Sequence, residues 1–288
     1  MKNKLLLVAL SMAALTACQG ESMTSLQVQQ DSAVINGSKV TARTTAAAKS
    51  LVFIELLEAN GRVRTFCSAA LVGMRTVLTA AHCFDPKHVK NFTGFQVVFA
   101  NQIGVRSSAL IRRGLVFKKH PQYNTNGVYN YDIAMAVFEG TAPAGFIPAV
   151  MDSDKRANYG GNTLYVYGYG RSQDYSGKPG ENLRHSVGVL HRGIVQVQND
   201  YNQLGDLYLL KTSSTSHICQ GDSGGPQFYS QNGVTKIVGV TSANFGKVME
   251  NGQHSCREYS QAAKVAPNYA WFKIEEKKAL AVTALPKR

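Results

Sequence analysis

Short apolar runs divide most of the chain into predicted strands. Between residues 51 and 138 these runs are apolar throughout or alternate with polar residues, and they end near Gly, Asn or Pro. This pattern is typical of antiparallel strands joined by turns. A looser stretch from Glu139 to Gly161 separates them from a second series. The predicted strands lie at residues 51–57, 67–73, 76–81, 95–100, 113–119, 132–138, 163–170, 183–195, 207–213, 225–230 and 236–243.

Only the C-terminal end of the chain carries a clear helical pattern. In "VAPNYAWFKIEEKKALAV" the apolar residues Ala270, Trp271, Ile274 and Leu280 recur at roughly helical spacing. Two series of strands followed by one helix predict an all-β protein of two similar halves with a helix at its end.

The first residues are typical of an export signal. Two lysines precede an apolar stretch from Leu5 to Leu15, which is too short to span a bilayer, and small residues follow. We therefore predict a signal peptide at residues 1–17. Because "LTAC" resembles the lipobox of bacterial lipoproteins, Cys18 is expected to be lipidated. The alternative is ordinary cleavage before Cys18, which leaves a free thiol. Residues 18–33 are polar and are expected to form a tether or propeptide.

Composition and charge exclude several classes of protein. The chain is 44% hydrophobic and 17% charged and has 26 glycines, which fits a globular β-rich protein and excludes a disordered or fibrous one. Lysine and arginine outnumber aspartate and glutamate by 31 to 18. This excess favours solubility and attraction to anionic surfaces or acidic substrates. No basic run is interleaved with aromatic residues, so we expect no nucleic-acid partner.

The cysteines other than Cys18 form an even set in a chain that is expected to be exported. Disulfides are therefore favoured over metal ligands. A zinc site made of Cys67, Cys83, His82 and His88 is the competing interpretation, but we expect no metal.

Three motifs carry the residues of nucleophilic catalysis. In "LTAAHC" His82 follows an apolar strand, and in "YNYDIAM" Asp132 starts a strand whose apolar residues can keep its carboxylate dry. In "CQGDSGGP" Ser223 is bordered by glycines. Alone, such a histidine is more often structural and such an aspartate is more often a turn residue. Together, in this order, they indicate a serine nucleophile, its base and an orienting carboxylate.

These motifs resemble those of the trypsin and chymotrypsin-like serine proteases, and the resemblance extends from Val34 to about Phe272. "VING" resembles the mature N-terminus of that family, "GYG" the start of its second barrel, and "GVTS" and "NYAWF" its substrate-binding strand and closing helix. The resemblance implies two antiparallel six-stranded β-barrels packed face to face with a C-terminal α-helix. The implied boundaries are about 34–145 and 146–264 for the barrels and 265–280 for the helix, with a tail at 281–288.

The resemblance also implies an activity. The chain is expected to be a serine endopeptidase in which His82 is the base, Asp132 orients it and Ser223 forms an acyl-enzyme, without a cofactor. The backbone N–H groups of Gly221 and Ser223 would stabilise the oxyanion. The implied disulfides are Cys67–Cys83 and Cys219–Cys256.

Activation by cleavage follows from the same resemblance. The new α-ammonium of Val34 would pair with Asp222, so the precursor is expected to be nearly inactive. Residue 33 is alanine, which implies an activating protease that prefers a small residue. That cut would detach residues 18–33 and any lipid on Cys18. We therefore expect a membrane-anchored precursor that is released when it is activated.

The expected specificity pocket argues against cleavage after basic residues. His217 occupies the floor position where trypsin-type enzymes carry an aspartate, and Ser242, Asn244 and Ser260 occupy wall positions. Ser242 can still bind the substrate backbone. An acidic side chain bound by a protonated or donor His217, a polar side chain and a medium-sized apolar one all remain open. Alternatively, a backbone carbonyl satisfies His217, which then only sets the pocket depth.

A catalytically silent homologue that acts in binding or adhesion is the competing function. Silent homologues usually lose a triad residue or a glycine beside the serine, and the chain retains all of these. As an enzyme, the chain is expected to have protein or peptide substrates, an activating protease and a bacterial membrane that holds the lipid as partners. It is expected to be a monomer.

Overall fold

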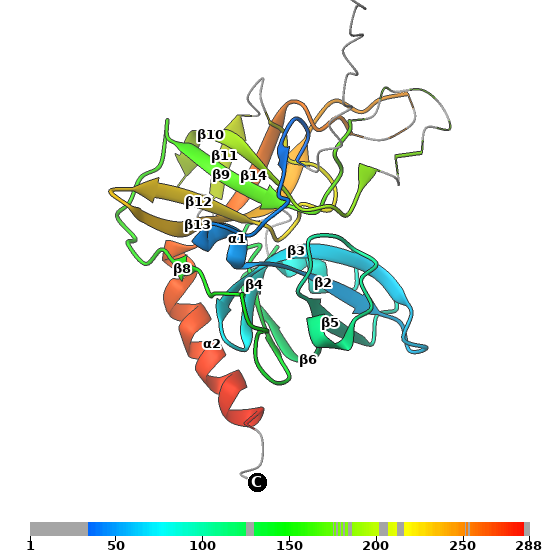
Figure 1. Cartoon of the computed structure of the whole chain (residues 1–288). Helices are drawn as coiled ribbons and strands as arrows, with labels where there is room; N and C mark the ends of the chain where they lie inside the picture. The colour runs from blue at the N-terminus through cyan, green and yellow to red at the C-terminus, as the bar shows by residue number, and fades with distance from the viewer. Residues whose placement is uncertain are drawn as a thin grey trace, which may run out of the picture.

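The computed structural model describes residues 34–124, 130–174, 186–201, 207–211, 216–250 and 254–284, with residues 176, 178, 180, 182, 183 and 252. A six-stranded barrel lies below a second sheet, and the helix α2 runs along the side of the barrel (Figure 1). The predicted all-β fold with one C-terminal helix is confirmed. The expected signal peptide, the lipidated Cys18 and the tether at 18–33 lie outside the described residues.

The first barrel closes in the order β2-β3-β4-β7-β6-β5, and β5 pairs back with β2. Its strands carry apolar side chains that are almost fully buried, including Phe53 in β2 and Phe138 in β7. Closure removes every free strand edge from this half of the molecule. The strands are β2 Leu51–Leu57, β3 Val63–Gly73, β4 Thr76–Thr79, β5 Gly94–Val98, β6 Ile111–Lys119 and β7 Ala134–Phe138.

Six strands of the second sheet also form a ring of pairings, because β9 pairs with both β10 and β12. The order round this ring is β9-β10-β11-β14-β13-β12. They are β9 Thr163–Gly168, β10 His191–Tyr201, β11 Leu207–Lys211, β12 Pro226–Gln231, β13 Val234–Phe245 and β14 Tyr259–Lys264. Two short strands add to it: β1 Ser38–Lys39 pairs with β10 and β8 Val150–Met151 with β13.

Two helices flank the strands. The single turn α1, Ala46–Lys49, precedes β2, and α2, Tyr269–Val282, packs against β7 of the first barrel. A 3₁₀ turn at Ala266–Asn268 comes directly before α2. The helix therefore starts later than residue 265, because Pro267 has no N–H and is accommodated in that turn. In the part of the chain that the structure describes, no helix has the length and apolar character needed to cross a bilayer.

The strand β14 was not predicted from the sequence, because "YSQAAK" shows no apolar run. Five of its six residues are nevertheless buried, including Lys264. The Lys264 ammonium lies 2.5 Å from Asp200 in β10, and both side chains are only 1% exposed. Asp200 also accepts a hydrogen bond of 2.9 Å from the backbone N–H of Tyr159. This ion pair allows a charged residue to occupy the barrel interior.

The buried ion pair yields a stability prediction. The change Lys264→Met leaves the Asp200 charge buried without a cation, so the free energy of unfolding should fall by about 3–5 kcal/mol. The matched control is Arg113→Met, which breaks the exposed Arg113–Glu139 pair and should change it by less than about 1 kcal/mol. Urea denaturation measures both. Equal losses in the two variants would contradict a special role for the buried pair.

Candidate active site

His82 lies in a short 3₁₀ turn that directly follows a buried strand. The turn Ala81–Phe84 begins two residues after β4 ends, and the disulfide Cys67–Cys83 ties it to β3. The two sulfur atoms are bonded to each other and are therefore not available as thiolate ligands for zinc. The His82 side chain is 17% exposed, so its ring reaches the surface from a fixed backbone.

Asp132 is fully buried and receives hydrogen bonds from two separate parts of the chain. The backbone N–H of His82 donates to its Oδ1 at 2.8 Å, and His82 Nδ1 lies 2.7 Å from its Oδ2. The hydroxyl of Ser242 in β13 donates to Oδ2 at 2.5 Å. The Ser242 side chain thus serves the carboxylate, and only its backbone is left for the expected contact with substrate.

The ionisation of this pair is set by opposing effects. Burial tends to lower the pKa of His82, but the charge and hydrogen bond of Asp132, with a contribution from Asp85, outweigh burial and raise the pKa above its usual value. Burial tends to raise the pKa of Asp132, but His82 and the hydroxyl of Ser242 hold it below its usual value. Asp132 therefore stays ionised and increases the basicity of the imidazole.

Ser223 is half-buried on a loop that packs against the end of β4. The backbone N–H of Gly224 donates to Thr241 O at 2.8 Å, next to Ser242. Gly224 has φ +80°, and a side chain there would collide with Thr79 Oγ1 and Ser68 O. Glycine is therefore required at this contact. The structure brings His82 and Asp132 into direct contact. The loop of Ser223 packs near them, because Gly224 contacts Thr79 before the His82 turn and Thr241 beside Ser242. Among the described residues, Ser223 forms no hydrogen bond with His82.

The peptide groups before and after Gly221 are each held by one hydrogen bond. The backbone N–H of Arg171 donates to Gln220 O at 2.9 Å, and because the peptide is planar the Gly221 N–H points the opposite way. The Ser68 hydroxyl of the first barrel donates to Gly221 O at 2.8 Å and accepts a bond of 3.0 Å from Tyr169 N–H. One buried hydroxyl therefore joins β3 to two loops of the second half.

Asp222 is a second buried carboxylate, and three backbone N–H groups of the described residues donate to it. Cys219 N–H reaches its Oδ2 at 2.9 Å, Gly170 N–H reaches its Oδ1 at 2.8 Å, and the N–H of Val34 is a further donor. Burial raises the pKa of Asp222 to about 7, although these donors and the charge of Arg171 act in the opposite direction. The carboxylate therefore lies in a site that would be stabilised by a positive charge.

The segment that starts at Val34 is inserted beside Asp222. Val34 and Ile35 are almost completely buried, and Ile35 exchanges two backbone hydrogen bonds of 2.9 Å with His217. Val34 has φ +56°, which is a strained conformation for a β-branched residue. The expected partners Val34 and Asp222 are thus in contact while the chain is continuous.

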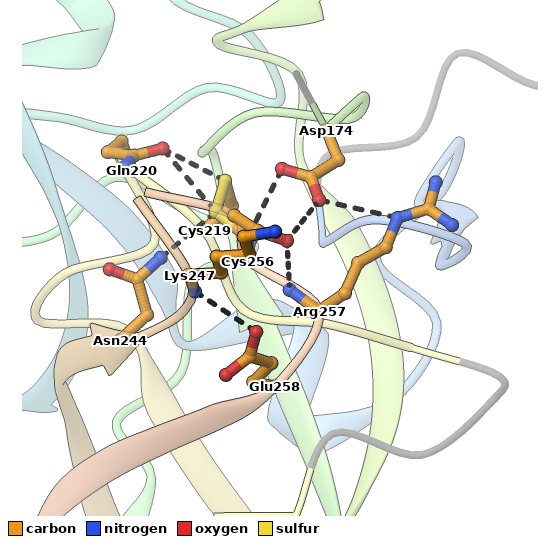
Figure 2. A network of polar contacts seen from close by, with 9 residues as sticks. Asp174, Cys219, Gln220, Asn244, Lys247, Cys256, Arg257 and Glu258 are labelled. Carbon is orange, nitrogen blue, oxygen red and sulfur yellow. Dashed lines mark hydrogen bonds and ion pairs between the residues drawn. A yellow bond between two sulfur atoms is a disulfide. The ribbon is translucent and has the colours of Figure 1, made fainter. Parts of the chain in front are cut away.

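The expected pocket wall contains a polar network around the disulfide Cys219–Cys256 (Figure 2). The Asp174 side chain is 2% exposed and accepts hydrogen bonds from Cys256 N–H at 3.1 Å and from the Ser255 hydroxyl at 2.9 Å. Arg257 Nε lies 3.3 Å from the same carboxylate. Its charge is therefore balanced by Arg257.

His217 is 7% exposed, and its Nδ1 has no partner among the described residues. No backbone carbonyl of the described residues bonds to this nitrogen, and the alternative in which a carbonyl satisfies His217 stays a prediction for the other ring nitrogen. Burial and the charge of Arg257 lower its pKa, against the opposing effect of Asp174. The imidazole is consequently neutral near pH 7, which argues against the protonated His217 that an acidic specificity would use.

Asn244 and Ser260 are paired directly across β13 and β14, so their side chains lie on the same face. Asn244 Nδ2 lies 2.9 Å from Cys256 Sγ, which connects it to the disulfide (Figure 2). Ser260 is fully buried, and its hydroxyl has no hydrogen-bond partner within the described part of the chain. The structure thus gathers Asn244, Ser260 and the disulfide at one wall.

Sequence reasoning missed three residues of this region. Ser68, Asp174 and Arg257 lie in no motif, and each acts through contacts with residues distant in the sequence. The only sequence signal is that Ser68 and Arg257 directly follow disulfide cysteines.

The comparisons with known proteins agree with the fold. The model of the Trypsin family matches residues 35–271. Transmembrane protease serine 9 of Rattus norvegicus is 28% identical over 205 residues, which is 64% of this chain and 18% of that protein. Trypsin Tyr p 3.0101 of Tyrophagus putrescentiae is 26% identical over 197 residues, which is 63% of this chain and 64% of that protein.

A third relative is chymotrypsin-like elastase family member 1 of Macaca fascicularis, 25% identical over 220 residues, or 72% of this chain and 77% of that protein. The matched region covers less than two thirds of the first two relatives. The family match extends from the residue after Val34 to Trp271 and includes both halves of the site. The chain belongs to the trypsin family of serine proteases.

Proposed function

We propose that the protein is an exported serine endopeptidase that uses His82, Asp132 and Ser223. The observation that carries the proposal is the buried Asp132, which holds both the backbone and the ring of His82 beside the glycine-bordered loop of Ser223. The raised pKa of His82 supports its role as a base near neutral pH. Family membership is consistent with peptide hydrolysis.

The proposed reaction proceeds through an acyl-enzyme. Ser223 Oγ bonds to the carbonyl carbon while its proton passes to His82 Nε2. The C–N bond then breaks, and the leaving amine takes that proton. Water, deprotonated by His82, attacks the ester and releases the acid and the free Ser223 hydroxyl. Asp132 keeps the proton on Nδ1 and stabilises the transient imidazolium.

The N–H groups of Gly221 and Ser223 are proposed to bind the oxyanion. The bonds from Arg171 N–H to Gln220 O and from Ser68 to Gly221 O support this proposal, because they hold the loop rigid before substrate arrives. Removing one such donor typically costs about 3–4 kcal/mol of transition-state stabilisation.

Labelling by an organophosphate probe tests the proposal. The activated protein should be labelled at Ser223 and should lose peptidase activity, because only an activated serine reacts. The change Ser223→Ala should abolish both, whereas the matched control Ser230→Ala, at an exposed serine in β12, should change neither. A folded, activated chain that resists the probe would favour the silent binding homologue.

We propose that the enzyme disfavours Lys and Arg before the cut bond. The pocket wall has no free negative charge among its described residues, because Arg257 balances Asp174 and His217 is neutral. Uncharged side chains suit this environment better than either charge.

Peptides that differ only at the residue before the cut bond measure this specificity. The values of kcat/KM should be lowest for Lys and Arg. In Arg257→Gln, where Asp174 loses its cation, the discrimination against them should weaken. A parent enzyme that prefers Lys or Arg contradicts the proposed pocket.

We propose activation by cleavage before Val34. The cut supplies an α-ammonium at the position where an N–H already approaches Asp222. It also removes the strain at Val34, because the torsion φ of +56° includes the carbonyl carbon of residue 33, which the cut detaches. We also propose that the protein is exported and carries a lipid on Cys18. Cleavage would then release residues 18–33 together with the lipid, and the released enzyme would be a monomer.

The pH dependence of stability distinguishes the cut chain from the uncut one. In the uncut chain the pKa of Asp222 rises from 3.8 to about 7 on folding. A raised carboxyl pKa gives stability that is fully present below pH 3.8 and is lost as the pH rises through about 7. The ammonium should offset this loss, so the Tm of the cut chain should exceed that of the uncut chain at pH 7 but not near pH 4.

The matched control for this experiment is Asp222→Asn, which keeps the shape of the side chain and should remove the pH-dependent difference. Mass analysis of the N-terminus of the native active protein identifies the cut. Active protein that retains a lipidated Cys18 would contradict release on activation, and a pH-independent Tm difference would contradict the Val34–Asp222 pair.

A further inference from the structure

The residue before Asp132 has an unfavourable backbone conformation. Tyr131 has φ +50°, in the left-handed region, and Ile133 N–H donates back to Tyr131 O at 2.7 Å across Asp132. For a residue with a side chain this conformation typically costs about 1–3 kcal/mol unless its surroundings enforce it. The tight turn sets the direction in which the Asp132 side chain leaves the backbone.

A stack of aromatic rings lies against this turn. The His120 ring is parallel to the Tyr131 ring, with an interplanar angle of 8° and centroids 4.7 Å apart. The rings of Trp271 in α2 and His120 meet edge to face, with centroids 4.6 Å apart and an angle of 65°. The backbone N–H of His120 also donates to Ile133 O at 3.0 Å. His120 thus holds the turn at two points: its ring stacks on Tyr131, and its backbone bonds to Ile133 after Asp132.

His120 acts in this stack as a neutral ring. It is mostly buried, and burial lowers its pKa to about 4. Its Nδ1 accepts a hydrogen bond of 3.2 Å from Gln122 N–H, which fixes the orientation of the ring. A neutral, oriented imidazole in contact with two aromatic rings is a stable packing arrangement. Within the described part of the chain, the rings of His120, Tyr131 and Trp271 form no hydrogen bond or ring contact with Asp132 or His82.

We propose that the His120–Tyr131 stack, supported by Trp271, is a positioning device that holds the left-handed turn and so aims the Asp132 carboxylate at His82. The kinetic part of this inference rests on the proposed peptidase function, whereas the structural part does not. Tyr131 is a positioning residue, and it acts only through the backbone of Asp132. The C-terminal helix thereby contributes to the site although it supplies none of the reacting groups.

Three substitutions of Tyr131 separate the ring from the backbone. Tyr131→Ala removes the stack but keeps the unfavourable left-handed backbone, so the turn should relax. Tyr131→Gly also removes the ring, but glycine adopts positive φ without steric penalty and should recover part of the effect. Tyr131→Phe keeps the stack and should behave as the parent. The matched control is Tyr165→Ala, which removes a half-buried aromatic ring from β9 in the other half of the molecule.

The main readout is the pKa of His82, measured by NMR in the Ser223→Ala background, where no activity is needed. Tyr131→Ala should lower this pKa toward the usual value of 6.5 and weaken the signal of the hydrogen-bonded Nδ1 proton. Tyr131→Gly should fall between Ala and the parent, and Tyr165→Ala should not shift the pKa. In the Ser223 enzyme, Tyr131→Ala should lower kcat about tenfold with little change in KM.

A double-mutant cycle tests the contact itself. His120→Ala should lower the His82 pKa in the Tyr131 protein but should have little further effect after Tyr131→Gly, because the ring it stacks on is already absent. Circular dichroism and the Tm show that each variant is folded. An unshifted His82 pKa in folded Tyr131→Ala overturns the proposal, and so do equal shifts in the Ala and Gly variants. If the parent lacks peptidase activity, the proposed function fails while the pKa arm still decides this inference.

Discussion

The burial of the Asp132 charge is the constraint on which the rest of the site depends. A carboxylate removed from water must be compensated by donors, and here they come from the turn after β4 and from β13. This requirement brings His82 and Ser242 from the two halves of the molecule to one point. Asp222 presents the contrasting case, because its burial outweighs the backbone donors and the charge of Arg171 and raises its pKa to about 7. Asp132 has a histidine partner in place, whereas Asp222 has a site that a positive charge would stabilise.

The sequence predicted those features that depend on local pattern. The apolar runs located β2, β6 and β13 closely, and the motifs identified His82, Asp132 and Ser223 as candidates. The strand β14 was missed because Lys264 looks like a surface residue until Asp200 is seen beside it. The range 183–195 was wrong in its first half, since β10 begins only at His191. In both cases long-range packing decided the outcome over local composition.

The charge of the pocket wall could not be predicted either, because it depends on contacts between residues far apart in the sequence. His217 was recognised by its position, but its protonation depends on Arg257 and Asp174, which come from two other loops. An ion pair of this kind leaves little net charge near the disulfide, although the chain as a whole is strongly basic. Overall charge therefore says little about the electrostatics of a site whose charges are paired internally.

The Ser68 hydroxyl has a consequence for how the protein folds. Its bond to Gly221 O joins residues 153 positions apart, and the bond from Ser242 to Asp132 joins residues 110 apart. Contacts between such distant residues form slowly, because the intervening chain must first be ordered. A folding intermediate with only the first barrel formed would hold His82 and Asp132, but it would lack Ser223 and the bond from Ser242 to Asp132. The candidate site is therefore complete only when nearly all of the chain has folded.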